Sequence, residues 1–173
     1  MHQEMMAWAD YWLITLVVAA ALSDVKDRTI PNYLTVTGLA IGLVLSLSPG
    51  GISPQGALLG AAIGFGVSLP LFALGAFGGG DAKLITAVGA FMGPVGMLEA
   101  LLGTALIGGA MAVYTTWRLG LLGQTISNTG ALVLNLVTVG RFGHRQTLRT
   151  EGVITIPYGV AIAAGSLIAR FAL

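Results

Sequence analysis

Gly78-Gly79-Gly80-Asp81-Ala82-Lys83 is the stretch that decides how this chain is organised. Three consecutive glycines let a backbone leave a helix, turn and approach other groups closely, because glycine carries no Cβ. Apolar runs flank the stretch at 64–77 and 84–92, so we expect the turn at or near a membrane boundary. An aspartate at the centre of a spanning helix costs about 2.5–3.5 kcal/mol, which makes such a residue a candidate for function. The alternative is a polar turn in which Asp81 and Lys83 only neutralise each other.

The composition predicts a polytopic membrane protein. Of 173 residues, 55% are hydrophobic and only 9% are charged, and the mean hydropathy is +0.89. A net charge of +1 without a long basic run argues against a nucleic-acid partner. The chain has no cysteine and only two histidines, His2 and His144, so we expect neither a disulfide framework nor a metal site, and no cofactor.

The apolar runs predict one all-α domain over residues 1–173, with about six transmembrane helices. The expected helices are 5–22, 33–47, 55–77, 81–93, 95–117 and 155–172. The first lacks the basic flank of a signal peptide and is expected to be retained. The fourth, at about 13 residues, is too short to cross a membrane unaided. In the third, Gly56, Gly60 and Gly64 recur every four residues and should let a neighbouring helix approach closely.

Basic residues predict the orientation of the bundle. The polar residues Asn128, Asn135 and Thr138 fall near one helical face, so we expect 124–138 to lie in the cytoplasmic interface without crossing. With an outside N-terminus, seven of the eight bases then share one side, which the positive-inside rule makes cytoplasmic. These seven are Lys26, Arg28, Lys83, Arg118, Arg141, Arg145 and Arg149, with Arg170 alone on the other side.

The same orientation brings two acids to the cytoplasmic side at similar depth, Asp24 at the end of the first helix and Asp81 at the start of the fourth. Two aspartates that share one proton can act together, the ionised one activating water and the protonated one donating to a carbonyl. That chemistry hydrolyses a peptide without a covalent intermediate. Intramembrane acids also mark proton or ion routes, so the residues alone leave a small coupled transporter equally open.

Two motifs resemble those of one enzyme family. The residues from Asp24 to Asn32 resemble the Asp-x-(Lys/Arg)-x-x-x-Ile-Pro-Asn signature of type IV prepilin peptidases, and residues 78–83 resemble their Gly-x-Gly-Asp-x-Lys motif. The segment Ile156-Pro157-Tyr158-Gly159 also fits the start of their last helix. The resemblance covers almost the whole chain and is greatest to the short peptidases of tight-adherence (Flp-type) pilus systems.

The resemblance implies a membrane aspartyl endopeptidase of the Gly-x-Gly-Asp group, in the bacterial inner membrane with its site facing the cytoplasm. It implies that Asp24 and Asp81 are the catalytic pair, and that the substrate is a pilin or pseudopilin precursor with a short basic leader. Partners would be this precursor and the lipid bilayer, and a homo-oligomer is compatible with the sequence. The motifs also supply supporting or substrate-binding candidates: Gly78, Gly80, Lys83, Lys26, Arg28, Pro31 and Asn32.

Two features qualify the resemblance. Asp27 lies one helical turn beyond Asp24, but the motif alignment selects Asp24, and we expect Asp27 to pair locally with Lys26 or Arg28. Larger prepilin peptidases carry a four-cysteine metal site and also methylate the new N-terminus. This chain has no cysteine and about ten residues between its first two helices, so we expect proteolysis without zinc and do not expect methyl transfer.

Overall fold

The computed structural model describes residues 2–48, 51–73, 77–120 and 157–172. These residues form α-helices joined by short turns, and no strand occurs among them, which confirms the predicted all-α class. The helices are α1 (His2–Asp27), α2 (Asn32–Ser46), α3 (Pro54–Ala73), α4 (Gly79–Arg118) and α6 (Tyr158–Phe171). The predicted interfacial segment 124–138 and the basic loop with Arg141, His144, Arg145 and Arg149 lie outside the described residues.

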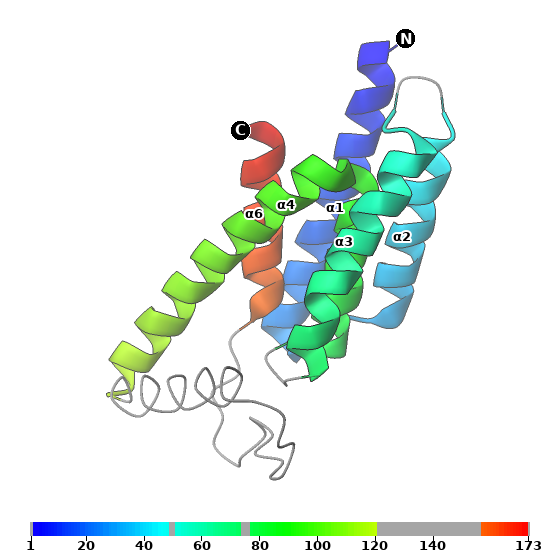
Figure 1. Cartoon of the computed structure of the whole chain (residues 1–173). Helices are drawn as coiled ribbons and strands as arrows, with labels where there is room; N and C mark the ends of the chain where they lie inside the picture. The colour runs from blue at the N-terminus through cyan, green and yellow to red at the C-terminus, as the bar shows by residue number, and fades with distance from the viewer. Residues whose placement is uncertain (1, 49–50, 74–76, 121–156, 173) are drawn as a thin grey trace, which may run out of the picture.

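Helix α4 contains a sharp break at Gly93. The backbone there has φ 69° and ψ −174°, a conformation essentially restricted to glycine, and Pro94 follows it. The predicted boundary between a fourth and a fifth helix is therefore present as a kink within α4. Figure 1 shows that α4 rises to this break and then descends, so that both of its ends lie at the lower end of the bundle.

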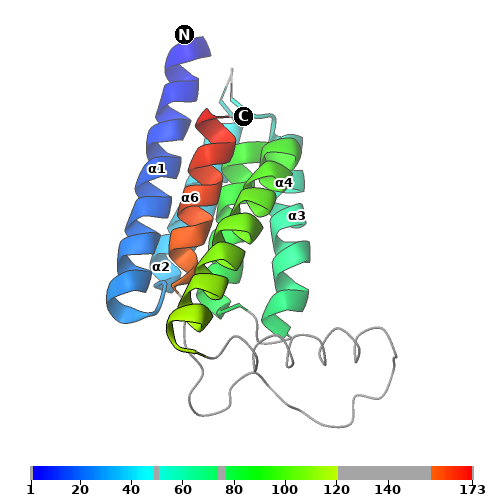
Figure 2. The ribbon, with the colours of Figure 1, turned by 90° about the vertical axis from the view of Figure 1, so that its left-hand side faces the viewer.

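The remaining helices run up and down beside the two arms of α4 (Figures 1 and 2). Helices α1 and α3 descend, whereas α2 and α6 rise, and the N-terminus of α1 and the C-terminus of α6 both lie at the upper end. The lower end therefore collects the end of α1, the beginning of α2 and α6, and both ends of α4. Three segments that are distant in the sequence are close to one another there: the turn between α1 and α2, the start of α4 and the start of α6.

Three helices are long and apolar enough to cross a membrane by length and composition. They are the helix from Trp8 to Asp27, the helix Pro54–Ala73 and the helix Gly79–Arg118. Helices α2 and α6 are apolar but shorter, about 21–23 Å at 1.5 Å per residue. Many large apolar side chains on the outside of the bundle are exposed, as expected where lipid is the solvent. The count of six spans stays a prediction.

The predicted glycine face of α3 packs directly on α4. A Cβ at Gly60 would collide with the backbone of Gly89 and Gly93, and a Cβ at Gly64 would lie 2.8 Å from the carbonyl oxygen of Ile85. Gly56 lies near Gly93, one further turn along. The close approach expected from the four-residue spacing is confirmed, and it holds the first arm of α4 in a fixed register on α3.

Some predicted helix boundaries differ from those of the structure. Helix α1 continues past Leu22 to Asp27, because helical hydrogen bonding does not end where hydrophobicity does. Helix α3 is described from Pro54 to Ala73, and Phe77, the expected last residue, lies in a bend and not in the helix. The last helix, expected from 155, begins at Tyr158 in the structure, with Pro157 as its N-cap.

An ion pair that the sequence did not predict joins α1 to α6. The Nε atom of Arg170 donates to Oδ1 of Asp10 at 2.6 Å, and both side chains are 23% exposed. Arg170 lies in the last turn of α6, the end opposite to the two motifs. Arg170, the one base that was expected on the side away from the cytoplasm, is therefore paired with an acid at the same end of the bundle.

Candidate active site

Asp24 lies in the last turns of α1 and points into the bundle. Its side chain is only 7% exposed, although the helix is close to its end. Asp27, one turn further on, is exposed. The two acids of this helix therefore differ in exposure: Asp24 is buried against other helices, whereas Asp27 is exposed. This agrees with the motif-based preference for Asp24.

The turn after α1 is fixed by local hydrogen bonds. Arg28 takes a left-handed conformation with φ 53°, and its N–H donates to the carbonyl oxygen of Asp24 at 3.0 Å, an arrangement that commonly ends helices. The Ser23 hydroxyl donates to the carbonyl oxygen of Thr29 at 2.9 Å. The chain is thereby folded back so that Ile30 becomes buried and Pro31 takes the N-cap position of α2.

Asp81 is held at the start of α4 by the glycine turn. The backbone N–H of Gly78 donates to Oδ2 of Asp81 at 2.9 Å, which caps the helix through its own third residue. A Cβ at Gly78 would lie 3.1 Å from that same oxygen. The glycine therefore leaves room for the carboxylate, which is half-buried.

The two sequence motifs are in contact with each other. A Cβ at Gly80 would lie 2.9 Å from Cβ of Ile30 and 3.1 Å from its carbonyl oxygen, so Gly80 packs directly on the turn between α1 and α2. The ammonium group of Lys83 donates to Oδ1 of Asn32 at 2.7 Å. Lys83 thus links α4 to the first turn of α2, and these contacts fix the start of α4 beside the end of α1.

The start of α6 forms the third side of this region. The N–H of Gly159 donates to Oδ2 of Asp24 at 2.7 Å. The ring of Tyr158 lies 4.8 Å from that of Phe77, between centroids, and packs over Gly108 in the second arm of α4. Asp24 therefore lies between α1, which carries it, and α6, which supplies a hydrogen-bond donor.

The contacts between the motifs place the two acids at the same end of the bundle. Asp24 accepts from the start of α6, and the turn that follows Asp24 packs on Gly80, the residue before Asp81. Two neighbouring carboxyl groups disfavour double ionisation, so one of them tends to keep a proton. One group of this kind can accept a proton from water while its neighbour donates one, the requirement for acid–base hydrolysis.

The supporting candidates lie around these acids in different settings. Gly78, Gly80, Pro31 and Asn32 belong to the contacts that join the two motifs. Lys26 and Arg28 are exposed at the same end of the bundle as Lys83. Basic side chains at a membrane surface commonly extend toward the headgroups, so the exposure of Lys26 is compatible with lipid contact.

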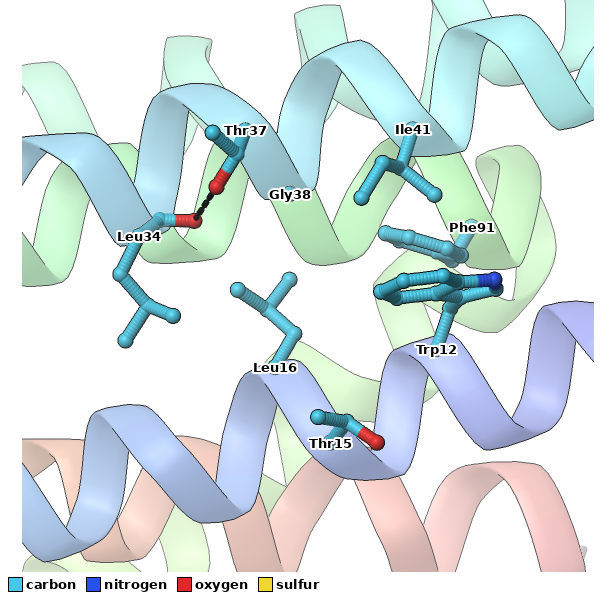
Figure 3. A pocket seen from close by; sticks show the side chains of 8 residues that line it. All are labelled: Trp12, Thr15, Leu16, Leu34, Thr37, Gly38, Ile41 and Phe91. Carbon is cyan, nitrogen blue, oxygen red and sulfur yellow. Dashed lines mark hydrogen bonds between the residues drawn. The ribbon is translucent and has the colours of Figure 1, made fainter.

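An apolar groove opens between α1 and α2, and neither Asp24 nor Asp81 lines it (Figure 3). It has a volume of about 60 Å³, and Trp12 and Phe91 lie side by side at one end of it. The Thr37 hydroxyl does not offer a free polar group, because it donates to the carbonyl oxygens of Tyr33 and Leu34 at 2.6 and 3.2 Å. The lining contains no ionisable side chain: Trp12, Thr15, Leu16, Leu34, Thr37, Gly38, Ile41 and Phe91. The groove is therefore not where hydrolytic chemistry would occur.

Within the described ranges, no group of three or more histidine, aspartate or glutamate side chains could hold a metal ion. The candidate site consists of two carboxyl groups and backbone donors.

The chain matches the type IV leader peptidase family over residues 5–113, a range that contains both Asp24 and Asp81. The chain belongs to the type IV leader peptidase family. The expectation drawn from the two motifs is thereby confirmed at the level of the family.

Curated relatives carry the name prepilin leader peptidase/N-methyltransferase. The chain is 30% identical to the one from Myxococcus xanthus (strain DK1622), over 68% of this chain and 37% of the relative. It is 33% identical to the one from Pectobacterium carotovorum subsp. carotovorum, over 66% and 43%. It is 30% identical to the one from Bacillus subtilis (strain 168), over 90% and 52%. The chain thus spans about half or less of the length of these relatives, and no solved structure matches it.

Sequence reasoning missed the part that α6 plays in this leader peptidase fold. The segment before Gly159 was noted for its resemblance, but no contact with Asp24 was expected. Hydropathy and motif spacing describe each helix alone, whereas this hydrogen bond joins residues 135 positions apart. The sequence feature that could have indicated this contact is the Pro-Tyr-Gly start of an apolar helix, because a glycine in the first turn permits another group to approach closely.

Proposed function

We propose that this protein is a membrane aspartyl endopeptidase that removes the short leader from pilin-like precursors, with Asp24 and Asp81 as its catalytic acids. The observation that carries the proposal is the meeting of the two motifs at one end of the bundle, through Gly80 packed on Ile30 and Lys83 bonded to Asn32. Family membership supports the reaction class. The names of the relatives support a prepilin as the substrate.

In the proposed mechanism one carboxylate removes a proton from water, and the water oxygen attacks the scissile carbonyl carbon. The protonated partner donates to the carbonyl oxygen, and a tetrahedral diol forms. In the collapse of the diol, the acid that was protonated by water donates its proton to the leaving amine nitrogen and the C–N bond breaks. The ionised partner takes the proton of one diol hydroxyl as the new C=O forms, which restores one ionised and one protonated acid. The proposal extends to peptide hydrolysis and not to methyl transfer.

We further propose that the site faces the cytoplasm of a bacterial inner membrane. Among the described residues, the lower end of the bundle carries Lys26, Arg28, Lys83 and Arg118, whereas the upper end carries Arg170. This asymmetry supports a cytoplasmic lower end by the positive-inside rule. A precursor could then present its leader from the cytoplasm while its apolar helix stays in the bilayer.

A proton- or ion-coupled transporter remains the alternative that the acids alone would allow. Membership of a peptidase family does not favour it. The two classes also differ in outcome, because a transporter would show flux that is lost when the acids are changed and would leave a precursor uncut.

The test is cleavage of a pilin precursor by Asp24→Asn and Asp81→Asn, each reconstituted in liposomes. Loss of a general acid or base costs about 10²–10⁴-fold in rate, so each variant should fall to near background with its fold retained. The matched control is Asp27→Asn, which removes an exposed acid from the same helix and should cleave normally. Cleavage at wild-type rates by either of the first two variants would exclude the paired mechanism.

A further inference from the structure

Helix α6 begins directly against the carboxylate of Asp24. The N-cap residue, Pro157, makes no side-chain hydrogen bond, so the first turn of α6 has no cap of its own. In its place the N–H of Gly159 donates to Oδ2 of Asp24 at 2.7 Å, in a buried contact. The positive end of a helix favours a negative partner, and here that partner comes from α1.

The contact requires a glycine at position 159. A Cβ there would lie 2.9 Å from Cβ of Asp24 and 3.0 Å from its Oδ2. A side chain would therefore push either the carboxylate or the start of α6 out of place. Because Gly159 fixes Oδ2, the orientation of the whole carboxyl group of Asp24 depends on this contact.

The arrangement repeats what the glycine motif does for Asp81. Gly78 donates its N–H to Oδ2 of Asp81 at 2.9 Å, and a Cβ at Gly78 would lie 3.1 Å from that oxygen. Each acid is thus held through Oδ2 by the backbone of a glycine near the start of a helix. From this pairing, and resting on the peptide hydrolysis proposed above, we infer that Gly159 is a positioning residue that orients Asp24 for the reaction.

Other contacts hold the start of α6 without this hydrogen bond. The Tyr158 ring packs on Phe77 and over Gly108. Further along, a Cβ at Gly165 would collide with Thr104 of α4, so the two helices are closely packed there. Weakening the Gly159 contact should therefore reorient Asp24 and leave α6 folded.

The kinetic test is Gly159→Ala, with kcat and KM measured separately on a pilin precursor. A displacement of about 1 Å in a catalytic group can cost about 10²-fold in rate, so we expect kcat to fall by about tenfold to hundredfold with KM nearly unchanged. The matched control is Gly165→Ala on the same helix, where the added methyl meets Thr104 and no acid. It should lower thermal stability and keep kcat per folded molecule.

A second measurement does not depend on activity. In protein labelled with carbonyl-¹³C tyrosine and ¹⁵N-glycine, the Gly159 amide is assigned directly, because Tyr158-Gly159 is the single Tyr-Gly pair in the sequence. Replacing the charged acceptor in Asp24→Asn should move this proton resonance strongly upfield, because a hydrogen bond to a carboxylate is stronger than one to an amide. An unchanged resonance would overturn the inference even if Gly159→Ala failed to fold.

The outcomes separate the inference from the proposed function. Full kcat in Gly159→Ala, with cleavage lost in Asp24→Asn and Asp81→Asn, would overturn the role of Gly159 alone. Cleavage that survives in Asp24→Asn would overturn the proposed hydrolysis itself. A selective fall in kcat together with the upfield shift would support both.

Discussion

The ammonium group of Lys83 donates a hydrogen bond of 2.7 Å to Oδ1 of Asn32, and so joins two motifs that lie 51 positions apart. The bond runs from the first turns of α4 to the first residue of α2. It is exposed, and exposed polar contacts are weak individually. Its consequence is geometric, because it helps to fix the end of α4 that carries Asp81.

Lys83→Met and Asn32→Ala should therefore be coupled. We expect each to lower the free energy of unfolding by up to about 1 kcal/mol, and the double variant to lose less than the sum. Thermal unfolding in detergent, followed by circular dichroism, provides the double-mutant cycle. Strictly additive losses would mean that the bond does not form in solution.

The sequence indicated those parts of the candidate site that depend on residues close to one another in the chain. The resemblance of residues 24–32 and 78–83 to two family motifs selected Asp24 and Asp81 as candidates, and their catalytic role stays a prediction. The fold class followed from composition, and the close packing of α3 followed from Gly60 and Gly64. These features are visible because each depends on residues within a few turns of one another.

Contacts between distant helices were not predicted, for a physical reason. The pairing of Asp10 with Arg170 and the bond from Gly159 to Asp24 depend on how whole helices are placed beside one another. Helix ends were also misjudged, because hydropathy reports where lipid contact stops, whereas the helix of Asp24 continues through charged residues to Asp27.

Packing of α3 on α4 should be intolerant of one added methyl group. Gly60→Ala would place a Cβ against the backbone of Gly89, and overpacking of this kind costs about 1–3 kcal/mol. The matched control is Gly66→Ala on the same helix, where a Cβ would meet nothing within 4 Å. Its stability should be unchanged or slightly higher, because alanine is the better helix former. Equal melting temperatures for the two variants would contradict this crossing.

The break in α4 should require a glycine at position 93. At Gly93 the backbone conformation excludes side chains, so Gly93→Ala should lower the free energy of unfolding by about 1–3 kcal/mol. Gly109→Ala, on the second arm, is the control, because a Cβ there would meet nothing within 4 Å. Thermal melts of the two variants make the comparison. A stable, unperturbed Gly93→Ala protein would show that the chain turns by another route.

The pair of Asp10 and Arg170 should fasten α1 to α6. Asp10→Asn leaves a half-buried guanidinium without its anion, and we expect a loss of about 1–2 kcal/mol. Exchange of the two residues, Asp10→Arg with Arg170→Asp, should recover part of that loss. Glu99→Gln is the control, since no ion pair to Glu99 is found in the part of the chain that the structure describes. If the exchange recovers nothing, the effect of Asp10→Asn comes from something other than the pair.

Membrane sidedness can be tested cleanly, because the chain has no native cysteine. The lower end of the bundle holds Thr29 and Leu119, and the upper end holds Gly51, all three exposed. If the lower end is cytoplasmic, a membrane-impermeant maleimide should label Gly51→Cys in intact cells. It should label Thr29→Cys and Leu119→Cys only after the membrane is permeabilised. Arg145→Cys should behave like Leu119→Cys if 124–138 stays in the interface. Labelling of Thr29→Cys in intact cells would reverse the orientation and place the acids away from the cytoplasm, where a leader could not reach them.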